Sequence, residues 1–289
     1  MWKSYCRSKN RERKLSAMKL VWLILATNAL LICAAAAAAD LHPIVEVQSG
    51  YLFGATSNGK WLKAEEAAKA LPSKTTYQVY GLTGSLGQAT AGKPKPSEED
   101  VCSDVLTVSL SLKPEKGVIA LAAPWNALPR KAQILDPTQQ VYVDAVRDFL
   151  KTKGIEQPKV KIDNILRVDL DGDGEDEVLI SATNYFGKDD RVPMRSPAGS
   201  YSMVLLRRVV AGKVETQLVE GEFHPKAYVR KEDSFDAPNA YKVIATLDLD
   251  GDGKMEVVVG SSYYEGEATT IYRCDPKKCE ALLSVGCGA

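Results

Sequence analysis

The sequence predicts a mainly β protein (an α+β chain with a few short helices) in which two acidic loops are the central feature. Three observations indicate this fold class. Short apolar, β-branched segments recur along the chain and are separated by Gly, Pro, Asn and Asp. A nine-residue acidic segment occurs twice, each time between two such apolar segments. Only residues 137–153 form a long stretch with the spacing of an amphipathic helix, so helices should be few.

Residues 1–39 have the pattern of a secretory signal peptide. They contain seven basic residues and one acidic residue, an apolar run from residue 20, and six alanines before Asp40. This order of basic, apolar and small residues is typical of a cleaved signal peptide, with Met1 or Met18 as the start. We expect cleavage before Asp40 and a secreted, periplasmic or cell-surface protein. The alternative is an uncleaved membrane anchor, because residues 20–39 are just long enough to span a bilayer.

The rest of the chain is mildly acidic. The whole chain has 37 basic and 37 acidic residues, and without residues 1–39 the net charge is −6. Such a charge gives no electrostatic footprint for nucleic acid or for an anionic lipid surface. We therefore expect no nucleic-acid partner, and membrane contact only through an uncleaved leader.

Four cysteines follow the leader, and an even number in an exported chain predicts two disulfides. Cys274 and Cys279 flank a four-residue turn and should face each other across a hairpin. Cys102 and Cys287 then pair by elimination. Zinc is the competing interpretation, but the cysteine spacing is poor and the chain has only two histidines.

Residues 40–130 should form a β-rich N-terminal region. Asn58-Gly59 is typical of a tight hairpin turn, and Pro72 should end a short helix. The glycine-rich residues 81–92 are expected to form a flexible turn region, and the Pro/Glu-rich residues 93–100 an exposed linker. The expected strands are residues 44–47, 51–55, 60–62, 77–80, 105–112 and 118–123, and the expected helix is residues 63–71.

An internal boundary is expected in residues 124–137, which look irregular. Residues 131–289 then begin with the best helix of the sequence, residues 137–153. Asp136 is a candidate N-cap, Pro137 fits the first turn, and Gly154 ends the helix. Its apolar face should pack on the sheet that follows.

The remainder of the chain reads as two similar repeats, at about residues 161–223 and 240–287. Each has the order strand, acidic loop, strand, strand, strand, which predicts a four-stranded antiparallel meander. The first copy carries an additional loop at residues 187–200.

The acidic loops are residues 169–177 (loop 1) and residues 248–256 (loop 2). Each has carboxylates at positions 1, 3, 5 and 9 and glycine at position 6, as at the start of an EF-hand-type calcium loop. Oxygen donors at this density favour calcium ahead of magnesium. A true EF-hand needs Glu at position 12, where this chain has Ile180 and Val259. The alternative is a metal-free Asp/Gly turn, but four crowded carboxylates without a cation would repel one another.

These loops, lying between apolar strands, resemble the FG-GAP/VCBS-type repeat of integrin α-chain propeller blades and many secreted bacterial proteins. The resemblance implies propeller-blade-like meanders and two calcium sites. A closed propeller needs more than two copies, so closure with another chain stays open. Position 9 is Glu, where the family more commonly has Asp. The ligands that the resemblance implies are the side chains of Asp169, Asp171, Asp173, Glu177, Asp248, Asp250, Asp252 and Glu256, with the main-chain carbonyls of Glu175 and Lys254.

No convincing catalytic motif is present, and His42 and His224 offer little scope for imidazole chemistry. The sequence therefore predicts a calcium-binding recognition, adhesion or surface module, with an extracellular protein or carbohydrate as ligand. The alternative is a secreted hydrolase, for example a carbohydrate-active one, in which calcium is structural and two carboxylates do the chemistry.

Overall fold

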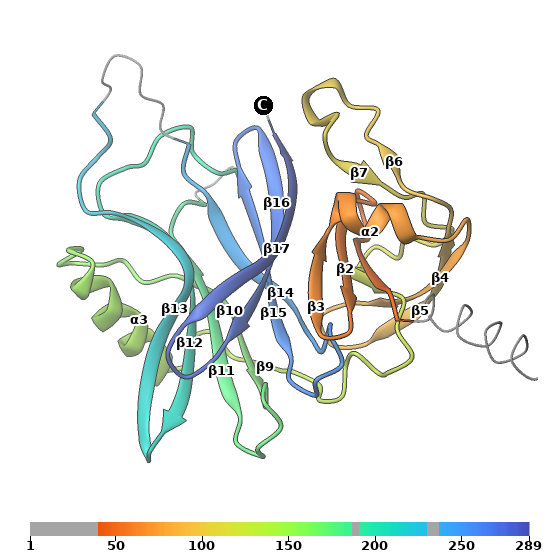
Figure 1. Ribbon diagram of the computed structural model, residues 1–289. Helices are drawn as coiled ribbons and strands as arrows, with labels where there is room; N and C mark the ends of the chain where they lie inside the picture. The colour runs from red at the N-terminus through yellow and green to blue at the C-terminus, as the bar shows by residue number, and fades with distance from the viewer. Residues whose placement is uncertain (1–39, 187–190, 230–236, 289) are drawn as a thin grey trace, which may run out of the picture. The chain divides into compact units, whose positions relative to one another are not determined.

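The computed structural model describes residues 40–186, 191–229 and 237–288, and the expected signal peptide lies outside them. The first repeat folds into an antiparallel sheet with the strand order β13-β12-β11-β10-β9 (Figure 1). Its strands are β9 (Gln133–Leu135), β10 (Ile162–Val168), β11 (Glu177–Thr183), β12 (Ser200–Val210) and β13 (Lys213–His224). The expected four-stranded meander is therefore present, and β9 adds a fifth strand. The additional loop expected at residues 187–200 lies partly outside the described residues.

The second repeat forms a four-stranded antiparallel sheet with the order β14-β15-β16-β17. Its strands are β14 (Ala240–Leu247), β15 (Glu256–Tyr263), β16 (Gly266–Cys274) and β17 (Cys279–Gly288). The mainly β fold class is confirmed. Loop 1 joins β10 to β11 and loop 2 joins β14 to β15, so both acidic loops lie at the same place in their sheets.

A third sheet contains six strands in the order β3-β2-β1-β8-β4-β5, and β6 pairs with β7 beside it. The Asn58-Gly59 turn between β2 and β3 is confirmed, because both residues have positive φ angles, 49° and 70°. The strands are β1 (His42–Glu46), β2 (Leu52–Ser57), β3 (Lys60–Lys63), β4 (Thr75–Tyr80), β5 (Ser85–Ala91), β6 (Lys95–Pro96), β7 (Leu106–Thr107) and β8 (Ile119–Leu121).

The described helices are short: α2 (Ala64–Ala70), the 3-10 turn η2 (Asp100–Cys102) and α3 (Gln140–Thr152). As expected, α3 packs on the first-repeat sheet, where its buried Val146 and Leu150 belong to one hydrophobic cluster with Ile165 and Tyr201. The expected N-cap is wrong. Asp136 Oδ1 instead accepts hydrogen bonds from the backbone and hydroxyl of Thr138 at 2.8 and 2.7 Å, in a turn before the helix. No described helix is long and apolar enough to cross a membrane.

Three local expectations are wrong. Residues 85–91 form β5 because they pair along β4, and small side chains such as Ala89 are buried there despite poor strand propensity. Residues 105–112 contain only the two-residue β7, since the backbone of Val108 bonds Gly50 and that of Ser111 bonds Thr90, so no continuous ladder forms. The irregular stretch 124–137 contains β9, which pairs with β10.

The two repeat sheets are joined at β14, which is an edge strand. Its backbone N–H groups at Tyr241 and Val243 donate to the hydroxyls of Ser202 and Ser181, at 2.8 and 3.0 Å. Both serines are fully buried in β12 and β11. The buried hydroxyls of the first-repeat sheet therefore accept hydrogen bonds from N–H groups at the edge of the second-repeat sheet. These bonds fix how the two sheets pack.

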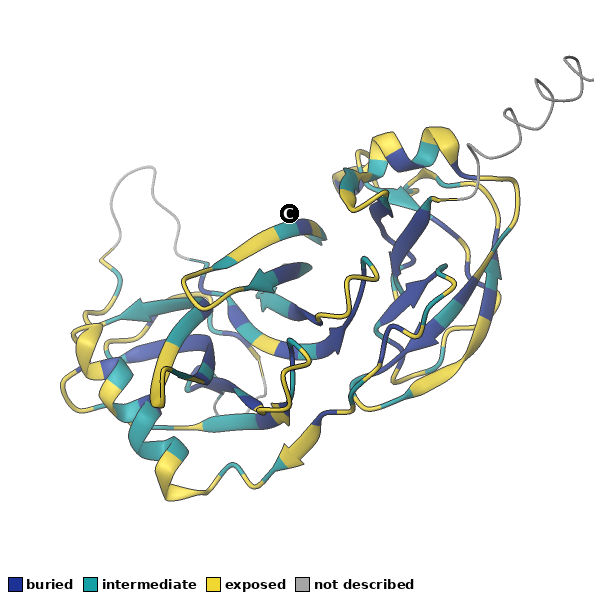
Figure 2. Cartoon of the chain, turned by 60° about the horizontal axis from the view of Figure 1, so that its bottom comes forward, coloured by how far each residue is buried: buried dark blue, intermediate teal, exposed yellow. Residues whose placement is uncertain are grey.

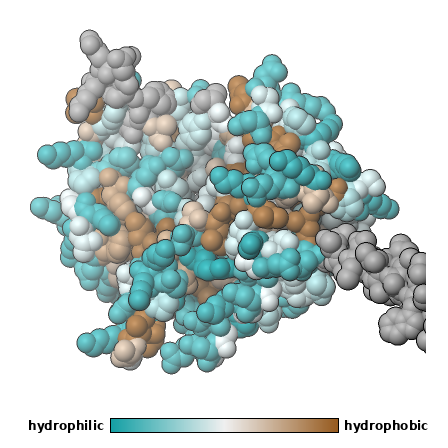
Figure 3. Space-filling view, in the orientation of Figure 1, coloured by the Kyte–Doolittle hydropathy of each residue, from teal (hydrophilic) through white to brown (hydrophobic). Residues whose placement is uncertain are grey.

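One hydrophobic core includes residues of all three large sheets, among them Ile44, Leu179 and Val258, each fully buried. From His42 onward the chain forms one compact unit. Figure 2 shows buried residues along strands of each sheet and exposed residues along the helices and turns. In Figure 3 hydrophilic residues cover much of the surface, and a small hydrophobic group marks the end of the β12–β13 hairpin, where Val209 and Val214 are exposed.

Candidate metal centre

Glycines give both loops the same sharp turn. Gly172 and Gly174 in loop 1 have φ angles of 81° and 90°, and Gly251 and Gly253 in loop 2 have 79° and 85°. Side-chain-bearing residues rarely adopt this left-handed region. The Gly at positions 4 and 6 therefore lets the chain fold back, so that its alternate side chains face one point.

The first aspartate of each loop braces the turn. In loop 1, Asp169 Oδ1 accepts the N–H of Gly172 at 2.6 Å, and its Oδ2 accepts the N–H of Gly174 at 3.1 Å. Asp248 makes the equivalent bonds in loop 2, to Gly251 at 2.7 Å and Gly253 at 3.1 Å. These bonds hold the loop in shape before any ligand binds.

The glutamate at position 9 closes each loop from the following strand. Glu177 Oε2 accepts the N–H of Leu170 at 2.8 Å, and Glu256 Oε2 accepts that of Leu249 at 3.0 Å. Both glutamates are buried, 5 % and 1 % exposed. The second oxygen of a buried carboxylate also needs a cation or another donor.

Three carboxylates converge in each loop, those of positions 1, 3 and 9. Ligand oxygens of Asp169, Asp171 and Glu177 lie within 4.8 Å of one another, and so do those of Asp248, Asp250 and Glu256. The position-5 aspartates, Asp173 and Asp252, each accept the backbone N–H two residues later at 2.8 Å. Their role as ligands, and that of the Glu175 and Lys254 carbonyls, stays a prediction.

Burial disfavours the charged form of these carboxylates. It raises the pKa of Glu256 to about 8, although hydrogen bonds from Leu249 and Arg273 oppose the rise. Burial likewise raises the pKa of Glu177 and Asp248, and neighbouring loop aspartates add to the effect. A bound divalent cation would reverse this balance by favouring the ionised carboxylates.

The donor set fits a hard cation. Every converging group is a carboxylate oxygen, which is the ligand type that calcium prefers. In loop 1 the Oδ1 atom of Asp171 is buried and has no hydrogen-bond partner. An unpaired buried carboxylate oxygen is costly, and a cation held by Asp169, Asp171 and Glu177 would satisfy it.

Two residues outside the repeats contact the acidic loops, Arg130 both of them and Trp125 loop 2, and sequence reasoning missed both. Arg130 donates to the carbonyls of Asp169 and Leu170 in loop 1, at 2.6 and 3.1 Å, and to Gly253 of loop 2 at 2.7 Å. Trp125 Nε1 donates to the Asp248 carbonyl at 2.9 Å. The contacts to Gly253 and Asp248 each join positions 123 residues apart, which periodicity along the chain does not reveal.

Arg273 is a third residue that sequence reasoning missed. It lies on β16 and forms ion pairs with Asp250 and Glu256 of loop 2. The surroundings of the two loops therefore differ, because among the described residues the ion pairs of loop 1 do not involve its positions 3 and 9. A signal existed: an arginine lies in the third strand of both repeats, Arg208 and Arg273.

The disulfides join the pairs expected from the sequence. Cys274 pairs with Cys279 across the β16–β17 turn, with Cα atoms 4.0 Å apart, and Cys102 pairs with Cys287, with Cα atoms 5.6 Å apart. Glu99 lies beside the second disulfide. The thiols are consumed in these bonds, so this group of three is not a metal site.

Ser196, His224 and Glu222 also gather near one another. The hydroxyl of Ser196 lies 3.2 Å from His224 Nε2, and Glu222 lies 3.6 Å from the same nitrogen. A hydrolytic relay needs the serine and the acid on opposite ring nitrogens, so this arrangement is not of that kind.

A cavity of about 640 Å³ lies between β1 and the β14–β16 region. Its lining includes the carboxylates of Glu46, Asp163 and Glu267 and the amines of Lys161 and Lys242. Both oxygens of Glu46 already accept bonds from the backbone of Gln48 and Ser49. The cavity combines polar groups with apolar surface, as ligand sites commonly do.

Comparison with known proteins found a similarity, which covers the second loop and its flanking strands. Residues 241–272 match the FG-GAP repeat model, over β14, loop 2, β15 and most of β16. This region is thus similar to a class of β repeat that suggests calcium binding. No curated protein and no solved structure matches the chain.

Proposed function

We propose that this chain is an exported calcium-binding β-repeat protein that acts as a recognition, adhesion or surface module. The convergence of three carboxylates in each of two braced loops carries the proposal. The FG-GAP match over loop 2 and the unpaired Asp171 oxygen in loop 1 support it independently. Calcium would neutralise these carboxylates and stabilise the sheets on either side of each loop.

Export is supported by the signal-like residues 1–39 and by the two disulfides, which form in oxidising compartments. Intact-mass measurement of the secreted protein tests it. A mature N-terminus within two residues of Asp40 supports export with cleavage, whereas retention of residues 20–39 contradicts it.

Calorimetric titration of the metal-free protein tests calcium binding. An exported protein meets abundant calcium, so a Kd of about 10⁻⁴ to 10⁻³ M would suffice. At calcium one hundred times Kd, each site should add about 2.7 kcal/mol to the free energy of unfolding. Absence of both heat and a shift in Tm at millimolar calcium and magnesium would falsify the calcium function.

Ligand recognition is proposed for the cavity that contains Asp163, Lys161 and Glu267. Binding of the purified protein to extracellular proteins and glycans, compared in calcium and in chelator, tests this role. Lys161→Gln and Glu267→Gln should lower binding, and Lys277→Gln, outside the cavity and both loops, should not.

The second candidate is a secreted hydrolase with structural calcium. It is favoured by the three carboxylates that line this cavity, those of Glu46, Asp163 and Glu267. Release of reducing sugar from a panel of polysaccharides separates the two candidates. Hydrolysis that is lost in Asp163→Asn or Glu267→Gln would establish the enzyme in place of the binding module.

A further inference from the structure

The second acidic loop already holds a positive charge of the protein itself. Arg273 Nη2 contacts a side-chain oxygen of Asp250 and lies 3.0 Å from Glu256 Oε1, to which Nε also donates at 3.2 Å. The side chains of Asp250 and Glu256 are only 5 % and 1 % exposed. The Arg273 side chain is 40 % exposed, so water screens these ion pairs in part. The guanidinium contacts Glu256 Oε1 and one oxygen of Asp250, while the loop backbone donates to the other oxygen of each carboxylate. A cation would need the same oxygens as the guanidinium.

A second contact fixes the arginine in place. The guanidinium carbon of Arg273 lies 5.7 Å from the centre of the Trp61 ring on β3. This distance is within the range of a cation–π interaction. Arg273 is thus held between Trp61 and the carboxylates of loop 2, and leaving the loop would cost it both contacts.

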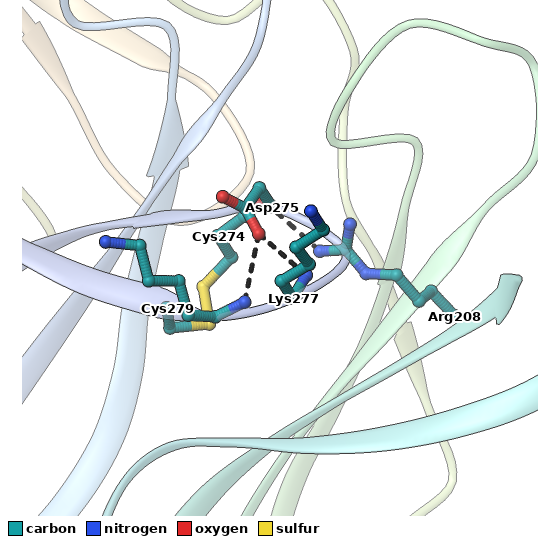
Figure 4. Close-up of a disulfide and its surroundings, with 6 residues drawn as sticks. Arg208, Cys274, Asp275, Lys277 and Cys279 are labelled. Carbon is teal, nitrogen blue, oxygen red and sulfur yellow. Dashed lines mark hydrogen bonds between the residues drawn. A yellow bond between two sulfur atoms is a disulfide. The ribbon is translucent and has the colours of Figure 1, made fainter.

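Among the described residues, no direct ion pair involves positions 3 and 9 of loop 1, although its sheet offers the equivalent arginine. Burial raises the pKa of Glu177, and the charge of that arginine, Arg208, opposes the rise without a direct ion pair. In the strand registers Val178 faces Arg207 and Val257 faces Tyr272, so the next residues, Arg208 and Arg273, correspond. Arg208, however, donates to the Cys274 carbonyl at 3.3 Å, in the β16–β17 turn (Figure 4). Among the described residues it forms no ion pair with loop 1, and Asp171 Oδ1 stays unpaired.

Arg130 does not replace the missing counterion. Its Nε lies 3.9 Å from Asp169 Oδ1, at the limit of an ion pair. Its donors are used on backbone carbonyls, including those of Leu170 and Gly253. The two loops consequently differ at positions 3 and 9, where loop 2 is paired with arginine and loop 1 is not.

We propose that Arg273 competes with the cation at loop 2, so that loop 1 is the tighter calcium site and loop 2 fills only when Arg273 leaves Asp250 and Glu256. This inference rests on the proposed calcium function and concerns how its two sites differ. Because Arg273 also contacts Trp61, filling loop 2 changes the contact between β3 and β16. Calcium concentration would then control that contact in addition to stability.

The titration should show two classes of site in the full-length purified protein. Asp250→Asn disables loop 2, so only the tight site in loop 1 should remain. Asp171→Asn disables loop 1, so only the weak site in loop 2 should remain. In the Asp171→Asn background, Arg273→Gln should tighten the remaining site at least tenfold, because the competing charge is gone. In chelator Arg273→Gln should lower Tm, since Asp250 and Glu256 lose their partner, and calcium should restore it.

Lys277→Gln is the matched control, because it removes the same charge from the exposed turn after β16, outside both acidic loops. Its effect on affinity should stay below threefold, since solvent screens an exposed charge. A tightening equal to that of Arg273→Gln would mean that net charge alone acts, and would overturn the inference.

Tryptophan fluorescence gives a measurement on the unmodified protein. Trp61 contacts Arg273, and Trp125 packs on Gly251, so both described tryptophans report on loop 2. The fluorescence change should follow the weak calorimetric phase. Two equal sites, or fluorescence that follows the tight phase, would refute competition by Arg273 while leaving the calcium function intact. Absence of any calcium binding would refute both.

Discussion

The backbone N–H of Met255 donates to the carbonyl oxygen of Leu170 at 2.7 Å, so the two acidic loops are hydrogen-bonded directly to each other. Arg130 bridges the same two loops through the carbonyls of Leu170 and Gly253. A change in one loop therefore reaches the other through one backbone bond and one side chain.

Arg130→Met should destabilise the protein by about 3 kcal/mol, because hydrogen bonds from a charged group are lost and partly buried carbonyls are left without a donor. It should also weaken calcium binding at both loops. Chemical denaturation and calcium titration measure the two effects. The control is Arg167→Met, which removes an exposed ion pair to Asp176 and should cost less than 1 kcal/mol. Equal losses for both variants would contradict the bridging role.

Gly251→Ala should cost more stability than Gly253→Ala. Both glycines have positive φ angles, so alanine at either position adds about 1–2 kcal/mol of backbone strain. A Cβ at Gly251 would lie 3.1 Å from the Trp125 ring, whereas a Cβ at Gly253 meets nothing within 4 Å. Thermal unfolding of the two variants gives the comparison, and a larger loss for Gly253→Ala would show that the Trp125 packing is unimportant.

The metal-free protein should lose stability as pH rises from about 5 to 8. Burial raises the pKa of Glu256 from 4.5 to about 8, so the folded state holds this proton more tightly than the unfolded state. The stabilisation from protonated Glu256 is complete below its pKa in the unfolded state. It is lost as pH rises through its pKa in the folded state. A pKa change of one unit corresponds to about 1.4 kcal/mol. The shift of Glu256 from 4.5 to about 8 therefore limits the loss of unfolding free energy to about 5 kcal/mol.

Glu256→Gln supplies the control for this pH dependence, because the amide does not titrate. Its unfolding free energy, measured without metal, should vary less with pH than that of the unmodified protein over the same range. In saturating calcium the ionised Glu256 is favoured, so calcium affinity should rise with pH. Parallel pH profiles for the two proteins would exclude Glu256 as the titrating group.

Removal of the Cys102–Cys287 bond should destabilise the protein more than removal of Cys274–Cys279. The two bonds span 185 and 5 residues. Loop-closure entropy then predicts losses of about 5 and about 2 kcal/mol. Denaturant unfolding of the paired Cys→Ala variants tests the order, and a larger loss from the short bond would show that local strain or packing outweighs chain entropy.

The repeats, their acidic loops and most N-terminal strands could be predicted because their signals are local. Alternating apolar residues, Asn58-Gly59 and the repeated Asp/Gly spacing act within a few neighbouring residues. The predictions were wrong for segments whose conformation depends on distant partners. Strand β5 forms from the weak strand formers of residues 85–91 because β4 pairs with it, and Val108 leaves its expected strand because its backbone bonds Gly50.

The sequence by itself determined the chemistry of the loops, since the order of carboxylates and glycines dictates both the turn and the oxygen donors. Only the tertiary structure decided which charges meet those donors. Arg208 and Arg273 occupy equivalent strand positions, yet one donates to the Cys274 carbonyl and the other pairs with Asp250. A long arginine side chain can reach several partners. Which partner it contacts depends on how the sheets pack, and therefore on contacts between segments far apart in the chain.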